Sequence, residues 1–212
     1  QGELFVAKKR RSKTRHSKKL FQHRWLIGIL TVIVLFLGAY VGHHFYQRYQ
    51  QQQIIERQQN AKRLFIKQVA PEAQAMQKKY NVPASITIAQ AILESDWGSS
   101  KLAAKYHNLF GIKGTGENSQ VLTTKEYVNG KWITTKGRFK VYSSWSESIK
   151  DHTKLMINGT DYNSQNYQAV TQASDYKEAA KALQEAHYAT DPDYAQKLIS
   201  VIQTYKLYNY DK

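Results

Sequence analysis

Glu94 is the residue of this sequence best placed to act as a proton donor. It follows the segment 86–93, where apolar residues occur on most sides of a helix and predict a largely buried helix. In the last turn of such a helix, the helix dipole and the apolar surroundings both disfavour an ionised carboxylate. We therefore expect a raised pKa, which suits a general acid working near neutral pH. Position alone does not distinguish this role from that of a solvated glutamate at a helix end.

Glu126 is the best candidate for the second carboxylate that a glycosidase usually needs. Two runs of β-branched and aromatic residues flank the Asn-Gly pair at 129–130, which is the strongest short signal for a β-hairpin. A two-residue turn there pairs Glu126 with Ile133. Tyr127 then pairs with Trp132, and these two rings lie together on the face opposite to Glu126.

The sequence lacks the residue patterns that several other kinds of catalytic site need. Glu117 is the alternative second carboxylate, but its glycine-rich loop 111–119 does not have the glycine spacing of a dinucleotide fingerprint. The chain of 212 residues has no cysteine, which excludes disulfides, thiolate zinc sites and a cysteine nucleophile. Its seven histidines form no His-Glu-x-x-His pattern, and no Gly-x-Ser-x-Gly elbow is present. We expect neither a metal nor a cofactor.

Aromatic residues offer rings on which a sugar could stack. Most aromatic side chains of a domain belong to its core, so we expect roughly half of those beyond residue 63 to be structural. Trp97, Tyr127, Trp132 and Tyr188 have the best claim to a cleft, because each lies beside a candidate carboxylate or in a predicted loop. Tyr194 completes our set of aromatic candidates for substrate binding.

The segment 25–42 predicts a membrane-spanning helix. It has no charged residue over 18 positions, and as a helix it would be about 27 Å long, close to the thickness of a bilayer's hydrocarbon core. A buried core helix of this length would normally carry a polar face. Nine Lys or Arg residues and one Glu occupy residues 1–24, so the positive-inside rule places the N-terminus in the cytoplasm and the rest outside. The stretch 37–39 is a poor cleavage site, which favours an uncleaved anchor over a secreted product.

The net charge of +15 is consistent with several polyanionic partners. The predicted outside location argues against nucleic acid. Anionic lipid and anionic wall polymers remain as partners that could attract the basic surface.

The chain divides into four predicted parts: a basic cytoplasmic segment at 1–24, a transmembrane signal anchor at 25–42, a Gln-rich stalk at 43–62 and a catalytic domain at 63–212. Helix signals dominate the last part. Pro71 and Pro192 are predicted as first helical residues, and Ser85 as an N-cap. Two further starts have capping-box patterns, Ser144-x-x-Glu147 and Asp175-x-x-Glu178. With the single hairpin, the fold class is α+β and mainly helical.

Four ordered motifs resemble one known family. They are "PASITIAQAILESDWGSSKLAAKYHNLFGIKG", "TKEYVNGKWI", "FKVYSSWSESIKDH" and "HYATDPDYAQKLISVI". Together they resemble the bacterial endo-β-N-acetylglucosaminidase domain of glycoside hydrolase family 73, found in autolysins and flagellar peptidoglycan hydrolases. The resemblance runs from about Phe65 to Tyr208. It implies a lysozyme-like fold with a helical lobe and a hairpin lobe around a glycan groove. It also implies cleavage of the β-1,4 bond on the reducing side of N-acetylglucosamine in peptidoglycan.

The resemblance also implies residue roles. The Glu of "AILES", Glu94, corresponds to the general acid, and the Glu of "TKEY", Glu126, to the hairpin carboxylate. Tyr188 of "YATDP" corresponds to a residue lining the catalytic centre. The loop "NLFGIKG" corresponds to the groove wall and supplies three residues that are expected to bind substrate: Asn108, Phe110 and Gly111. Asp96 and the pair at 186–187 depart from the family pattern, and both departures leave the carboxylates in place.

Three mechanisms and two other functions remain open at this point. Glu126 could activate water, attack directly as a nucleophile, or steady a reaction in which the substrate's own N-acetyl oxygen attacks. A muramidase or lytic transglycosylase could use the same fold on the same glycan. A non-catalytic domain that binds the wall is the second of these other functions.

Overall fold

The computed structural model describes residues 14–128 and 131–211, and for residues 14–23, 125–128 and 132 it describes the backbone alone. The chain divides into two compact units, Gln1–Gln58 and Gln59–Lys212. The helix α1 (Thr14–Tyr80) contributes to both units. The boundary lies four residues before the predicted end of the stalk at residue 62.

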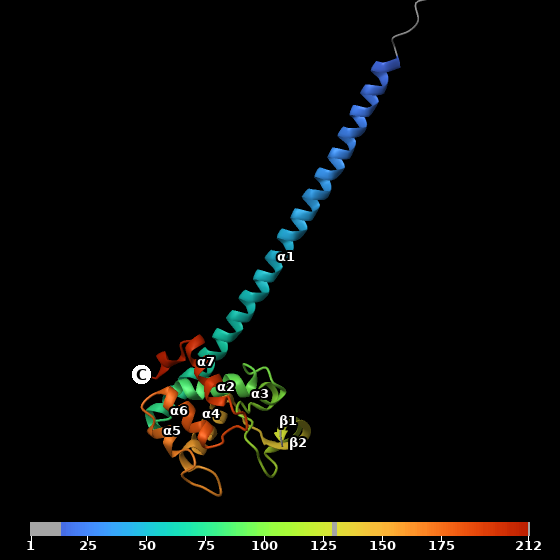
Figure 1. Cartoon of the computed structure of the whole chain (residues 1–212). Helices are drawn as coiled ribbons and strands as arrows, with labels where there is room; N and C mark the ends of the chain where they lie inside the picture. Colours follow the sequence, from blue (N-terminus) through green and yellow to red (C-terminus); the bar gives the residue numbers. More distant parts are fainter. Residues whose placement is uncertain (1–13, 129–130, 212) are drawn as a thin grey trace, which may run out of the picture. The chain divides into compact units, whose positions relative to one another are not determined.

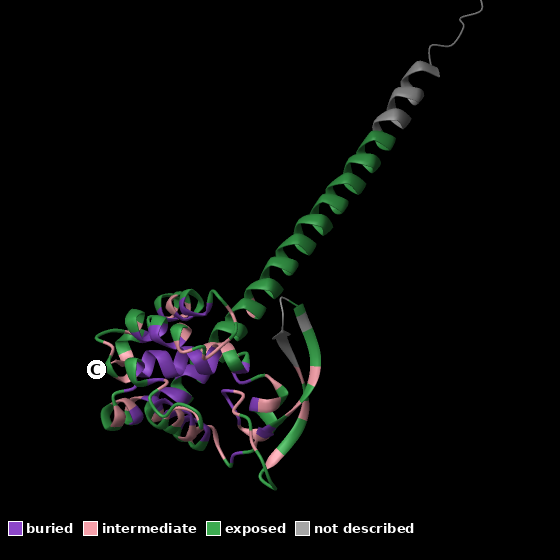
Figure 2. Cartoon of the chain, turned by 60° about the horizontal axis from the view of Figure 1, so that its bottom comes forward, coloured by how far each residue is buried: buried purple, intermediate pink, exposed green. Residues whose placement is uncertain are grey.

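The first unit contains the described part of α1 up to Gln58. Its apolar residues from Trp25 onward are exposed, as the green of this stretch in Figure 2 shows. Within the described residues, α1 is the one helix long and apolar enough to cross a membrane, with a mean hydropathy of 2.3 over its most apolar window. None of that window is buried, whereas the core helix of a soluble protein would be mostly buried.

The second unit has a helical lobe and a β-hairpin at its edge (Figure 1). The helix α2 (Ala84–Ser95) lies within the lobe and contacts the elements α6, α7 and η1. The remaining elements of the lobe are α3 (Lys101–Tyr106), α4 (Trp145–Asn158), α5 (Gln168–Gln172), α6 (Tyr176–Glu185), α7 (Tyr194–Thr204) and the 3-10 helix η1 (Leu207–Tyr210).

Burial explains why α2 lies in the middle of this lobe. Ten of its twelve residues are buried, and only Leu93 and Glu94 reach solvent. Each isoleucine side chain taken from water stabilises the fold by about 1.5–3 kcal/mol. The segment 86–93 is therefore the largely buried helix that its sequence predicts.

The hairpin consists of β1 (Ser119–Val128) and β2 (Lys131–Lys140), paired antiparallel. The backbone register places Glu126 opposite Ile133 and Tyr127 opposite Trp132, which confirms the predicted pairing. The turn residues 129–130 lie outside the described residues. At its base, the hairpin is joined to the loop after α3, because Lys140 N–H donates to the carbonyl of Ile112 at 3.0 Å.

Both capping boxes form as predicted. The Ser144 hydroxyl accepts a hydrogen bond from the Glu147 amide at the start of α4, and Asp175 accepts from the Glu178 amide at the start of α6. Local hydrogen bonding fixes these helix starts, so the sequence pattern alone is sufficient to find them.

Several predicted helix starts are wrong. Pro71 lies inside α1, because the apolar residues on either side of it pack into the core of the second unit, and this packing outweighs the hydrogen bond that proline cannot donate. Ser85 is buried one residue inside α2, and its amide donates to Asp211 at 2.7 Å. The last helix begins at Tyr194 rather than Pro192. At the other end of α2, the C-cap is Asp96, in the left-handed conformation.

Candidate active site

Glu94 lies at the end of α2 and accepts a hydrogen bond from a tyrosine of another helix. The Tyr194 hydroxyl, at the first residue of α7, donates to Glu94 Oε1 at 2.8 Å. The Gln90 amide donates in turn to that hydroxyl at 3.2 Å. Gln90 and Glu94 are four residues apart, so they lie on the same face of α2 and reach the same tyrosine. Tyr194 is therefore fixed between two side chains of one helix.

Desolvation controls the charge state of Glu94. One side of the residue opens to solvent, but the protein around the carboxyl group raises its pKa above the ordinary 4.5, and the hydrogen bond from Tyr194 lowers the pKa only in part. The direction agrees with the sequence-based expectation. A raised pKa keeps more of the protonated form, which is the form that a general acid must supply.

Two tyrosine rings stack beside this carboxylate. Tyr188 lies against Tyr194 with ring centroids 5.7 Å apart and an interplanar angle of 18°. Burial, and next the nearby charge of Glu94, hold the pKa of Tyr188 well above its ordinary 10. Burial and the same charge hold the pKa of Tyr194 well above 10. Both phenols are therefore neutral hydrogen-bond donors near neutral pH.

A buried histidine packs against the Tyr188 ring. His152 of α4 stacks on Phe110 at 3.9 Å between centroids and meets the edge of Tyr188 at 5.9 Å. It is completely buried, and neither ring nitrogen has a hydrogen-bond partner in the described part of the chain. Burial lowers its pKa to about 3, so the ring is neutral.

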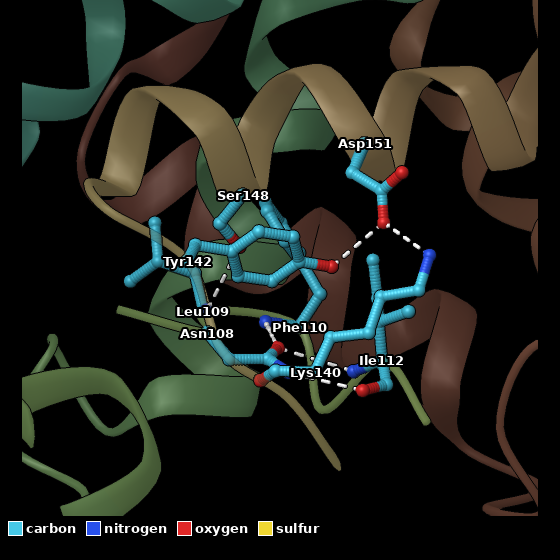
Figure 3. A network of polar contacts seen from close by, with 8 residues as sticks. All are labelled: Asn108, Leu109, Phe110, Ile112, Lys140, Tyr142, Ser148 and Asp151. Atoms are coloured by element: carbon cyan, nitrogen blue, oxygen red, sulfur yellow. Dashed lines mark hydrogen bonds and ion pairs between the residues drawn. The ribbon is translucent and has the colours of Figure 1, made fainter. Parts of the chain in front are cut away.

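Asn108 has a different role from the one that the resemblance implies. A substrate contact was expected, but only 1% of the residue is exposed and its amide bonds to main-chain atoms alone. Its Nδ2 donates to the carbonyls of Ile112 at 3.0 Å and Lys140 at 2.9 Å. Its Oδ1 accepts from the amides of Phe110 and Ile112. Figure 3 shows the amide at the centre of this loop, so Asn108 fixes the shape of the loop and does not offer its amide to a ligand.

The same loop is fastened to α4. The Leu109 amide donates to the Ser148 hydroxyl at 3.1 Å, and Asp151 accepts from Lys140 at 2.8 Å and from Tyr142 at 2.7 Å (Figure 3). Burial tends to raise the pKa of Asp151, but these two hydrogen bonds and the lysine charges outweigh it and lower the pKa. Asp151 is therefore a structural anion that ties the end of β2 to α4.

The other predicted wall residues differ in accessibility. Phe110 is buried under His152, so it supports the site and does not offer its face to a sugar. Gly111 has a φ of +66°, and no atom lies within 4 Å of the place a Cβ would take. This backbone therefore has open space on that side. Glu117, the alternative second carboxylate, is exposed in its loop.

Trp97 packs inside the protein in a way that the sequence did not predict. Its ring meets Phe65 at 6.0 Å and Tyr205 at 4.7 Å, and the ammonium group of Lys62 lies 5.0 Å from its centroid. Three of its neighbours therefore come from α1 and the end of α7. These contacts favour a structural role over the expected role of a platform for sugar.

The candidate site residues of the hairpin are described by their backbone alone. The side chains of Glu126, Tyr127 and Trp132 are outside the described residues, so their roles stay predictions. Among the described side chains, no group of three or more His, Asp or Glu residues could hold a metal ion.

A family model described as mannosyl-glycoprotein endo-beta-N-acetylglucosaminidase matches residues 70–207. The chain belongs to this glucosaminidase family. Its fold agrees with the solved catalytic domain of the autolysin Auto from Listeria monocytogenes, with a TM-score of 0.65 and 40% identity over 71% of this chain and 88% of that one. The predicted mainly helical, lysozyme-like glucosaminidase fold is confirmed.

Two curated relatives carry different activity names. The exo-glucosaminidase LytG of Bacillus subtilis is 49% identical over 150 residues, covering 70% of this chain and 53% of that protein. A probable N-acetylmuramidase of Lactococcus lactis is 38% identical over 183 residues, covering 84% of this chain and 41% of the relative. The chain thus spans about half or less of the length of these relatives. Their names differ in the sugar residue whose bond is cleaved.

The sequence of this glucosaminidase did not predict the residues that hold Glu94 and its neighbouring rings in place. Tyr194 was expected to bind substrate, but it is 4% exposed and its hydroxyl bonds to Glu94. Gln90 and His152 received no role. The spacing of Gln90 and Glu94 was the one available signal for a shared partner.

Tyr194→Phe tests the hydrogen bond to Glu94. The bond favours the ionised carboxylate, so its loss raises the pKa of Glu94 further. A general acid loses activity as pH rises through its pKa, and we expect the basic limb of the pH profile of kcat/KM to move to higher pH. Tyr162→Phe, at an 86% exposed position, is the matched control. An unmoved limb in the Tyr194 variant would show that the bond does not tune Glu94.

His152 makes stability depend on pH. Its folded-state pKa of about 3 lies below the unfolded value of 6.5, so the stability present above pH 6.5 is lost as pH falls toward 3. Between pH 6.5 and pH 5 this single group removes about 2 kcal/mol of unfolding free energy. We expect His152→Phe, which keeps a flat ring against Phe110, to lack that part of the slope in denaturant titrations. The exposed control His187→Asn keeps the native slope, and equal slopes in all three proteins would contradict the assignment.

Proposed function

We propose that this glucosaminidase-family chain is an endo-β-N-acetylglucosaminidase that cleaves the β-1,4 bond between N-acetylglucosamine and N-acetylmuramic acid in peptidoglycan. The observation that carries the proposal is the carboxyl group of Glu94, held by Tyr194 in a setting that favours its protonated form. The names of the relatives, a glucosaminidase and a muramidase, support a glycan of the cell wall as substrate.

Glu94 acts as the general acid in this proposal. Its proton passes to the glycosidic oxygen as the bond to the anomeric carbon breaks and positive charge develops on the sugar ring. The proton then leaves with the sugar whose hydroxyl is released. Tyr194 keeps the carboxyl group in one orientation during the transfer, and the conjugate carboxylate is stabilised by the same hydroxyl.

The second group in the reaction is either Glu126 or the acetamide of the substrate. Glu126 would activate water from the hairpin, whose backbone register brings it opposite Ile133. In the substrate-assisted route, the acetamide oxygen attacks the anomeric carbon, and water later opens the resulting ring. Tyr188, a neutral phenol next to Glu94, is the described residue best suited to donate a hydrogen bond to either group.

The apolar part of α1 fits a membrane anchor in this proposal. Anchoring through residues 25–42 with the second unit outside the cell would keep the enzyme beside the wall glycan. A signal sequence near the N-terminus has the same length and composition, and protease protection of the chain in sealed membrane vesicles separates the two. An anchored chain stays with the vesicles and exposes its second unit on the wall-facing side.

Glu94→Gln tests the general acid. We expect wall hydrolysis to fall by at least about a hundredfold, because amide nitrogen cannot supply the proton. The folded-state pKa of Glu94 is raised, so the stability it contributes below pH 4.5 is lost as pH rises through that higher pKa. The variant should therefore gain stability relative to the native protein as pH increases, as measured by thermal unfolding. Glu185→Gln, at an exposed position of α6, is the control. An active Glu94→Gln protein would refute the proposal.

Mass spectrometry of digested and borohydride-reduced wall decides the bond. The proposal expects new chain ends carrying reduced N-acetylglucosamine, appearing first in oligomers of mixed length. Reduced N-acetylmuramic acid would assign a muramidase, and anhydro-muramic ends a lytic transglycosylase. Early release of single sugars would assign an exo-enzyme. Binding to wall without any new ends would assign a wall-binding domain.

A further inference from the structure

The turn that follows Glu94 has an unusual backbone. Asp96, Trp97 and Gly98 are consecutive left-handed residues, with φ values of 49°, 58° and 76°. A bulky residue such as tryptophan rarely takes this conformation, and it persists only where the surrounding structure imposes it. The turn begins two residues after Glu94, so whatever holds it also holds the end of α2.

A cluster of aromatic rings surrounds this turn. A Cβ on Gly98 would lie 2.7 Å from the ring of Trp145 and 2.9 Å from that of Phe65, so the glycine is packed directly under both rings. Trp97 lies between Phe65 and Tyr205, with edge-on contacts to each. The turn is therefore held from α1, from α4 and from the end of α7.

Lys62 joins two of these rings. Its ammonium group lies 5.0 Å from the centroid of Trp97 and 5.6 Å from that of Tyr205, and it donates a hydrogen bond to the Tyr205 hydroxyl at 3.0 Å. The residue is half-buried, and among the described side chains it pairs with no carboxylate. A cation over two rings and against a hydroxyl is attracted by all three groups.

These contacts connect to both partners of the hydrogen bond between Tyr194 and Glu94. Trp97 follows the helix that carries Glu94. Tyr205 is the C-cap of α7, the helix whose first residue is Tyr194. Lys62 therefore links the end of α2 to the far end of α7. Because a helix transmits displacement along its axis, a shift of Tyr205 moves the Tyr194 hydroxyl as well.

We propose that Lys62 is a positioning residue of this active site, which clamps Trp97 to Tyr205 and so holds Glu94 against Tyr194. Lys62 and Phe65 precede the range 70–207 that the family model matches. The segment 59–69 of α1 follows the apolar segment 25–42 in the sequence. It is thus a functional part of the catalytic unit in this chain. The inference rests on the proposed role of Glu94.

Kinetics of the full chain in detergent, with solubilised glycan strands as substrate, test the clamp. Lys62→Met keeps the aliphatic stem and removes the cation. We expect kcat to fall about tenfold, since small displacements of a reacting group have effects of this order, and KM to stay within about twofold. Because the clamp holds Glu94 against Tyr194, its loss weakens the hydrogen bond that lowers the pKa of Glu94, so the basic limb of the pH profile moves to higher pH. This shift has the same direction as the one expected for Tyr194→Phe.

Two further variants complete the comparison. Lys62→Arg keeps a cation over the rings and should restore most of kcat. Lys67→Met removes an exposed lysine of the same helix and should leave both constants unchanged. If Lys62→Met does not fold, Tyr205→Phe removes only the hydroxyl partner of Lys62 and should reduce kcat about threefold without a change in KM.

Three outcomes would overturn the inference. An unchanged kcat and pH profile in folded Lys62→Met would show that the clamp does not position Glu94. A raised KM with unchanged kcat would assign Trp97 and Lys62 to substrate binding. Failure of Lys62→Met to fold together with native kinetics for Tyr205→Phe would leave the cluster a purely structural role. Failure of the proposed function is distinct, because the native chain itself would then create no new ends of reduced N-acetylglucosamine.

Discussion

Burial of α2 is the constraint on which the rest of the catalytic unit depends. A helix that buries ten of its twelve residues has almost no freedom to rotate or slide, because each shift would expose isoleucine side chains or leave cavities. The single carboxylate that it presents to solvent is therefore held as firmly as the core itself. Glu94 owes its position to the segment before it, and the polar chemistry of the site begins where the apolar packing ends.

The charge state of Glu94 results from two opposing effects. Desolvation favours the neutral acid, and the hydroxyl of Tyr194 favours the carboxylate. A general acid needs both, because it must hold a proton before the reaction and stabilise the anion after it. Around this pair the structure supplies neutral groups: the phenols of Tyr188 and Tyr194 and the imidazole of His152. Because these three groups are uncharged, the proton of Glu94 is the one in this set that responds to pH.

Local signals in the sequence were sufficient for two capped helix starts and for the hairpin, and they were insufficient for the contacts between elements. Capping at Ser144 and Asp175 and the register of the hairpin depend on residues a few positions apart, and these predictions are confirmed. The role of Asn108 depends on the carbonyl of Lys140, which is 32 residues away, and the packing of Trp97 depends on α1 and α7. Neither contact leaves a periodic pattern. The resemblance identified Asn108 as part of the groove wall without showing that its amide faces inward.

The cause of the raised pKa of Glu94 limits which group can act with it in the proposed reaction. A carboxylate at the 5–5.5 Å separation of a retaining pair would repel the ionised form and raise the pKa of its neighbour by charge. Among the described side chains no carboxylate has this effect: desolvation is the cause that raises the pKa of Glu94. In the proposed reaction, the nucleophile or base would then come from the hairpin, from water or from the substrate. In the proposed reaction, the hairpin would bring Glu126 toward Glu94 when a glycan binds, so binding of the acetamide and arrival of Glu126 would be parts of one closing step.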